Sequence, residues 1–190
     1  MKILLVTAAI ALGIASCNSK KPSPETGPAI VKDTATAIAA ADTSHPDIEK
    51  KEPELGGIGE LNLGTTHTKV VELLGEPSSK SKAEEWGADG LMHQDWMYKN
   101  KGITLNMSSG KDITRQDVNS ITITSPCDLK TNKNIGIGSS YTDVMTAYEK
   151  DIDKAASTKD AVIVGSIYGG IFFDFLKDKV VKIFVGAGAE

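Results

Sequence analysis

The sequence is poor in aromatic residues and in cysteine, and it has no excess of basic residues. Of 190 residues, 5% are Phe, Trp or Tyr, and two are Cys. Two cysteines cannot build the disulfide framework of a small secreted scaffold. Lys and Arg number 21 against 25 Asp and Glu, for a net charge of −4, whereas a nucleic-acid-binding domain normally carries a basic excess. These absences exclude a disulfide scaffold and argue against a nucleic-acid partner.

The common catalytic signatures are also missing. The chain contains no Gly-x-Ser-x-Gly, no Walker sequence and no His-Glu-x-x-His. A protein-bound metal usually takes three or four convergent ligands, but His45, His67 and His93 are isolated from one another in the sequence. We therefore expect no metal, no other cofactor and no enzymatic activity.

One apolar run stands at the N-terminus. After Lys2, the 13 residues from Ile3 to Ala15 carry no charge. This is shorter than the roughly 20 residues that span a membrane, and it fits the apolar region of a secretory signal. The run ends in Gly-Ile-Ala-Ser followed by Cys17, which resembles the cleavage box of bacterial lipoproteins. The resemblance implies a signal peptide over 1–16 and a diacylglycerol and an acyl chain (typically palmitate) on Cys17. An ordinary N-terminal helix with a buried cysteine is the alternative.

The residues after Cys17 predict where the anchor sits. Asn18 replaces the Asp that marks inner-membrane retention in enterobacteria, and no acidic cluster resembling a surface-export signal follows. We therefore expect a lipid-anchored protein of the outer membrane that faces the periplasm. Large apolar side chains are nearly absent from 17–56. Such a segment buries too little surface to offset its ordering entropy, so we expect a flexible, disordered tether.

From Gly57 onward the sequence contains two similar stretches. In each, a turn glycine and a hydroxyl residue suited to N-capping precede apolar residues at helical spacing. The matching positions are Gly64 with Gly138, Thr66 with Ser140, Val70 with Val144, and Leu74 with Tyr148. The pattern predicts a short amphipathic helix in each stretch. Gly75 and Pro77 indicate the end of the first helix.

Alternating apolar residues follow each expected helix. They fall in runs over 96–98, 103–107 and 118–123, and then over 162–168, 171–175 and 180–185. Period-2 alternation with short turns predicts antiparallel hairpins. We therefore expect an α+β fold of two tandem units, 57–126 and 127–190. Each would be a helix on a three-stranded antiparallel meander, with the two sheets joined or packed together.

The first stretch resembles a known family. Gly64, Val70 and the Leu-Gly-Glu-Pro ending at 74–77, followed by the aromatic strand around Trp96 and the closing strand from Val118, are similar to the BamE-like domain of outer-membrane assembly lipoproteins. The same helix and meander resemble each half of the tandem β-lactamase-inhibitory proteins. The resemblance covers about 57–187 and implies a protein-binding role. The second stretch departs from it, because Glu-Lys-Asp replaces the Leu-Gly-Glu-Pro ending.

Two strands of the second stretch carry a candidate binding surface. Phe172 and Phe184 alternate with the residues expected in the core, and Asp174 and Lys182 share their face. If this face is open, it is an apolar surface with a charged fringe, as expected of a protein interface. Alternatively, the two rings pack against the other repeat or the tether. Trp86 is a second candidate anchor, because Trp is enriched at binding hot spots; its alternative is to fold back as a lid on the core.

These patterns predict a lipid-anchored periplasmic protein that acts as a non-catalytic binding or scaffold module. Its partners would be the membrane, through Cys17, and another envelope protein, with a possible place in outer-membrane assembly. The alternative is an inhibitor or immunity-type protein that blocks an enzyme through its sheet face and loops. Cys127, the remaining thiol, is expected at the end of a strand and half-buried.

Overall fold

The computed structural model describes residues 57–188. The expected signal peptide, Cys17 and the tether lie outside the described residues, as do the last two residues of the chain. Two helices and a short 3-10 helix lie among the strands: α1 (His67–Leu74), η1 (Lys99–Lys101) and α2 (Tyr141–Ala147). The strands are β1 (Gly57–Ile58), β2 (Leu61–Asn62), β3 (Ser79–Lys80), β4 (Glu84–Glu85), β5 (Met92–Tyr98), β6 (Ile103–Ser109), β7 (Asp117–Thr124), β8 (Ala161–Ser166), β9 (Gly169–Leu176) and β10 (Lys179–Gly186).

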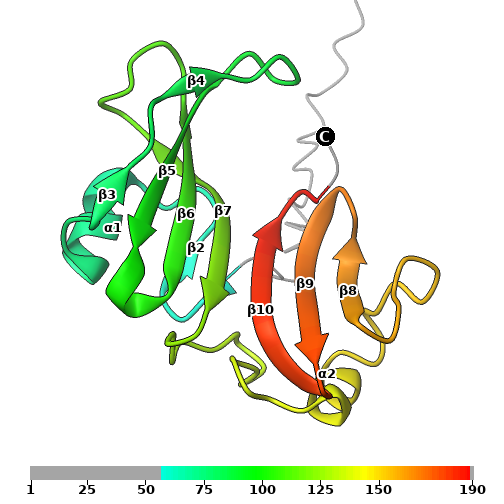
Figure 1. The fold of residues 1–190 in the computed structure, drawn as a ribbon. Helices are drawn as coiled ribbons and strands as arrows, with labels where there is room; N and C mark the ends of the chain where they lie inside the picture. The colour runs from blue at the N-terminus through cyan, green and yellow to red at the C-terminus, as the bar shows by residue number, and fades with distance from the viewer. Residues whose placement is uncertain (1–56, 189–190) are drawn as a thin grey trace, which may run out of the picture. The chain divides into compact units, whose positions relative to one another are not determined.

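Eight of the strands form one antiparallel sheet (Figure 1). The order is β3-β5-β6-β7-β10-β9-β8, and β4 also pairs with β5. The centre of the sheet is the pairing of β7 with β10, in which Ile123 lies opposite Ile183 and Ile121 opposite Val185. The remaining pair, β1 and β2, forms a separate two-stranded sheet.

The expected α+β fold of two tandem units is wrong, because the described residues are mostly β. The helices α1 and α2 have only eight and seven residues, whereas one sheet runs through both stretches of the chain. The capping signals correctly placed two helices, but caps do not set how long a helix is. Separate units would also leave one edge each of β7 and β10 unpaired, and pairing these two edges satisfies their backbone groups.

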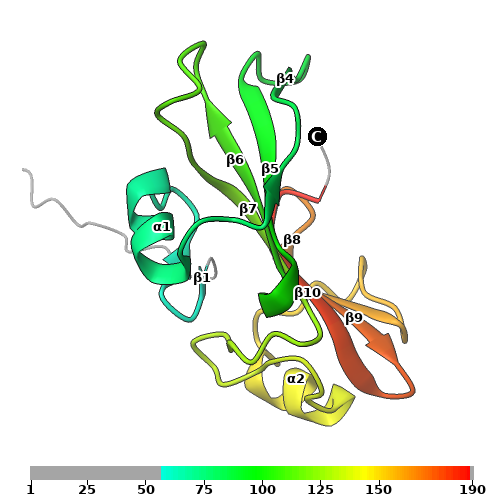
Figure 2. The same cartoon turned by 60° about the vertical axis from the view of Figure 1, so that its left-hand side comes forward.

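One face of the sheet carries the core. Two cross-strand rows of buried residues run along it. These rows are Tyr98, Ile103, Ile123, Ile183, Phe173 and Val162, and then Trp96, Leu105, Ile121, Val185, Ile171 and Val164. Both helices lie on this face (Figure 2). The ring of Tyr148, just after α2, is 5.5 Å from that of Phe173, and the Tyr98 hydroxyl donates to Gly75 O at the end of α1 (3.2 Å).

The two edges of the large sheet differ: one ends in very short strands and the other is covered by a loop. At one edge, β3 and β4 pair with β5. At the other, a loop runs along β8: Asp153 N donates to Ile163 O (2.9 Å) and Gly165 N donates to Asp151 O (2.8 Å). One edge thus consists of two strands of two residues each and the other is covered, so neither edge offers a partner a long unpaired strand.

Candidate functional site: an open sheet face

The sheet face opposite the helices is here called the open face. One cross-strand row on it runs from β5 to β8 and comprises Met97, Thr104, Thr122, Phe184, Phe172 and Ile163. Since side chains alternate along a strand, none of these points toward the helices. Within this row the polar residues lie on β6 and β7 and the aromatic residues on β9 and β10.

The aromatic part of the row is a pair of rings. Phe172 and Phe184 lie opposite each other in register, and their rings meet edge to face with centroids 5.4 Å apart. Both are half-buried. The chain after β10 passes over Phe172, since a Cβ at Gly188 would lie 2.6 Å from Phe172 Cζ. The two rings therefore pack on each other and on this glycine, and part of each stays accessible.

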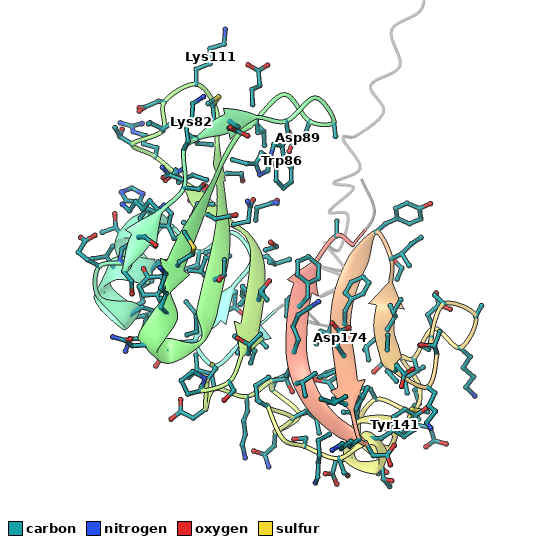
Figure 3. The ribbon with its side chains drawn as sticks, in the orientation of Figure 1. Lys82, Trp86, Asp89, Lys111, Tyr141 and Asp174 are labelled. Atoms are coloured by element: carbon teal, nitrogen blue, oxygen red, sulfur yellow. The ribbon has the colours of Figure 1, made fainter. Side chains whose placement is uncertain are left out.

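A charged pair borders the aromatic rings. Asp174 and Lys182 are the next register pair on the open face, and Lys182 Nζ lies 2.6 Å from Asp174 Oδ2. Figure 3 shows Asp174 on β9. Leu176, two residues further along β9, is 63% exposed. A partly exposed ion pair contributes little to stability, so this pair serves as a polar margin to the apolar surface.

Trp86 reaches the open face from the loop 86–91 between β4 and β5, here called the Trp86 loop (Figure 3). The loop is closed by two backbone hydrogen bonds, from Trp86 N to Leu91 O (2.9 Å) and from Gly90 N to Trp86 O (2.8 Å). The indole stacks on the His93 ring with centroids 3.7 Å apart and an interplanar angle of 8°. Trp86 therefore folds back, as the alternative held, but over a polar ring on the open face and not over the apolar core.

His93 is part of a polar network beneath the indole. It is 2% exposed. Its Nε2 lies 2.9 Å from Asp89 Oδ2 and its Nδ1 lies 2.7 Å from Asn106 Oδ1. Asn106 Nδ2 donates to Asp95 Oδ1 (2.8 Å), and Asn119 Nδ2 donates to Asn106 Oδ1 (3.3 Å). The network links the Trp86 loop to β5, β6 and β7.

The Asp89 carboxylate stabilises the Trp86 loop from within. Its Oδ1 accepts a hydrogen bond from Leu91 N (2.9 Å) and its Oδ2 faces His93. The bond from Leu91, followed by the contact with His93, holds the pKa of the Asp89 carboxyl below its ordinary value. Asp89 is therefore ionised at neutral pH, with one carboxylate oxygen facing Leu91 N and the other facing His93 Nε2.

Two clefts flank Trp86. The first, of about 290 Å³, is lined by residues of the Trp86 loop, β7, β10 and the chain end: Trp86, Asn119, Ser120, Phe184, Ala187 and Gly188. The second, of about 240 Å³, lies over the polar network and includes Lys82 and Glu84. Trp86 and Phe184, 98 residues apart in the chain, thus border one cleft, while Phe172, Asp174 and Lys182 are not among its lining residues.

Sequence reasoning missed the polar part of this site. From the sequence, His93 was expected not to bind a metal, and Asp95 had no predicted role. The signal was in the register, because Asp95 pairs with Asn106 and His93 with Ser108 on the same face. Asp89, four residues before His93, could not have been assigned, since its contact depends on how the loop folds back.

Metal and thiol chemistry find no support among residues 57–188. No group of three or more His, Cys, Asp or Glu there could hold a metal ion. Cys127 is a free, buried thiol, and desolvation raises its pKa above the ordinary value. It lies three residues beyond the end of β7, more deeply buried than expected, which fits a packing role.

The fold and the site define a mostly β protein whose sheet has one helix-covered face and one face with an aromatic cleft. No family model, curated protein or solved structure matches the chain. The resemblance to BamE-like lipoproteins therefore stays a prediction. Neither α1 nor α2, the α-helices of the described part, is long and apolar enough to cross a membrane.

Proposed function

We propose that this chain is a lipid-anchored protein of the bacterial envelope that binds another protein through its open face and catalyses no reaction. One observation carries the proposal. Three aromatic side chains gather on the sheet face that the helices leave free, and two of them, Trp86 and Phe184, border one cleft.

The composition of the open face supports a protein partner. Buried aromatic anchors surrounded by a polar margin are typical of protein interfaces. Here the margin consists of the Asp174–Lys182 ion pair and of Asn119 and Ser120 in the cleft. A cleft of about 290 Å³ has room for one large side chain, so the partner would insert an apolar side chain between Trp86 and Phe184.

Attachment to the outer membrane on its periplasmic side is the second part of the proposal. Its support is the sequence alone: the apolar run 3–15, Cys17 after small residues, and the polar segment that follows. Two or more acyl chains hold a protein stably to a bilayer, whereas one chain does so only marginally. The 17–56 segment would then let the folded part reach a partner at a distance from the membrane.

Attachment is tested by labelling cells with a palmitate analogue. We expect label on the protein and recovery in the membrane fraction, with both lost in Cys17→Ser. The matched control is Cys127→Ser, which removes the other cysteine and should keep label and membrane association. Label that persists in Cys17→Ser would contradict the assignment.

Binding is tested by placing a photo-crosslinking amino acid at two positions in intact cells. Position 184 lies in the cleft, and Tyr168, at the β8–β9 turn, is 76% exposed and serves as the matched control. We expect a discrete adduct from position 184 and none of that mass from position 168. Mass spectrometry of the adduct identifies the partner. Equal adducts from both positions would show nonspecific contact and overturn the proposal.

Affinity measured with the purified partner, together with urea unfolding, separates an effect of a substitution on binding from an effect on folding. We expect Phe184→Ser to weaken its affinity at least tenfold, about 1.4 kcal/mol or more, while Tyr168→Ser leaves it unchanged. Because Phe184 is only half-buried, the urea midpoint of the variant should fall little. Unchanged affinity in Phe184→Ser would remove the cleft from the interface. A partner enzyme that loses activity on binding would identify the inhibitor alternative.

A further inference from the structure

The His93 ring is the point where the Trp86 loop is attached to the sheet. The indole of Trp86 covers one face of the ring at 3.7 Å, and Asp89 of the same loop faces its Nε2 at 2.9 Å. Two of the six residues in the loop therefore contact one imidazole. The position of Trp86, and with it one wall of the cleft shared with Phe184, depends on this ring.

Both ring nitrogens face hydrogen-bond acceptors. On one side stands the carboxylate of Asp89 and on the other the carboxamide oxygen of Asn106. The orientation of the Asn106 amide is set by its other neighbours, because its NH₂ donates to Asp95 and its oxygen accepts from Asn119. A reversed amide would place its oxygen against the Asp95 carboxylate.

The number of ring hydrogens therefore matters. A neutral imidazole carries one N–H, whereas the imidazolium carries two. With one N–H, the oxygen of either Asp89 or Asn106 would face a lone pair of the imidazole, which is unfavourable because the ring itself is buried. With the Asn106 amide in this orientation, both contacts are hydrogen bonds when the ring carries two N–H groups.

Charged groups surround the ring from several elements. Asp89 approaches from the Trp86 loop, Glu84 of β4 is the register partner of His93, and Asp95 of β5 is linked to it through Asn106. Lys82 is the cation among the residues lining the adjoining cleft. On the β7 side, Asp117 is the register partner of Ser108, which itself pairs with His93. Carboxylates thus outnumber cations around the imidazole.

We propose that His93 is a pH-dependent latch for the Trp86 wall of the cleft. The protonated ring holds Asp89 and the stacked indole in place, and loss of one ring proton releases the Trp86 loop and opens the wall. Histidine is the ordinary side chain whose charge changes between about pH 5 and 8. The inference rests on the proposed function for its meaning, since a released Trp86 would no longer face the partner beside Phe184.

The latch is tested without any partner, so its failure is distinct from failure of the proposed function. The purified full chain is labelled with 5-fluorotryptophan; its two tryptophans give two ¹⁹F signals, which Trp86→Phe assigns. Between pH 5 and 8 we expect the Trp86 signal to shift with one midpoint while the Trp96 signal stays. The shift should vanish in His93→Gln and persist in His67→Gln, the matched control on α1.

A second variant provides an independent test if His93→Gln fails to fold. Asp89→Asn weakens the ionic contact without changing β5, and we expect its Trp86 signal at pH 5 to lie near the pH 8 position of the unsubstituted protein. A Trp86 signal that does not move between pH 5 and 8, or one that moves equally in His93→Gln, would overturn the proposal.

Discussion

A single glycine, Gly102, allows the backbone after η1 to approach the end of β7 closely. Gly102 follows η1 and has a φ of +63°, a left-handed conformation that L side chains rarely adopt. A Cβ there would overlap Thr124 O and come within 2.9 Å of Cys127 N. Thr124 N in turn donates to Gly102 O (2.9 Å). Glycine is therefore required by both conformation and space.

We expect Gly102→Ala to lower the free energy of unfolding by at least about 2 kcal/mol, because backbone strain and an overlap with β7 add together. Urea denaturation followed by circular dichroism measures the change. Gly87→Ala is the matched control, since a Cβ there meets nothing within 4 Å, and it should change stability by less than about 0.5 kcal/mol. Equal stability of the two variants would contradict this account.

At the scale of the element, the short helix α2 depends on its first turn. Ser140 Oγ accepts a hydrogen bond from Asp143 N (3.1 Å), and Asp143 Oδ2 accepts one from Ser140 N (2.8 Å). This capping box satisfies two backbone donors that a helix leaves unpaired. A helix of seven residues gains little from propensity alone, so the cap and packing on the sheet hold it.

The same cap makes stability depend on pH. Hydrogen bonds from Ser140 hold the pKa of the Asp143 carboxyl below its ordinary value. Its contribution is therefore fully present above the unfolded-state pKa of about 3.9 and is lost as pH falls through the lower folded-state pKa. We expect Asp143→Asn to be less stable than the unsubstituted protein at pH 7. That difference should shrink steadily below about pH 4 in urea unfolding, and a difference that grows there would refute the sign.

At the scale of the whole described fold, β7 and β10 join the two halves of one sheet. Ile123 and Ile183 face each other across this pairing, and both are fully buried. The buried rows continue on both sides without a gap. Since this central pair joins the strands on its two sides into one sheet with a continuous buried face, we expect the sheet to unfold as a unit.

Shortening a buried side chain at the centre of the sheet tests whether the sheet unfolds as a unit. We expect Ile183→Ala to cost about 2–5 kcal/mol, as for other buried aliphatic residues replaced by Ala. Amides of β5–β6 and β8–β9 should lose hydrogen-exchange protection by the same amount. Val181→Ala, at a residue 39% exposed in the same strand, is the control and should leave both regions unchanged. Loss of protection in β8–β9 alone would show that the halves are independent.

The local elements were largely readable from the chain. The helix α1 ends at Gly75, whose φ of +78° favours glycine. The alternating apolar residues of β6 and β9 lie on the buried face. Such features depend on neighbours within a few residues, which is why pattern alone predicts them. The same alternation correctly turned Phe172 and Phe184 away from the helices.

Only the tertiary structure decided the rest. The pairing of β7 with β10 joined the strands into one large sheet of a mostly β fold, where two α+β units were expected. The sequence of a strand does not indicate which other strand will pair with its free edge. The same pairing placed Thr122 beside Phe184, and the return of the Trp86 loop placed an indole on His93. Periodicity records which face of an element is buried, whereas the neighbour that each exposed side chain gains is fixed by contacts between residues far apart along the chain.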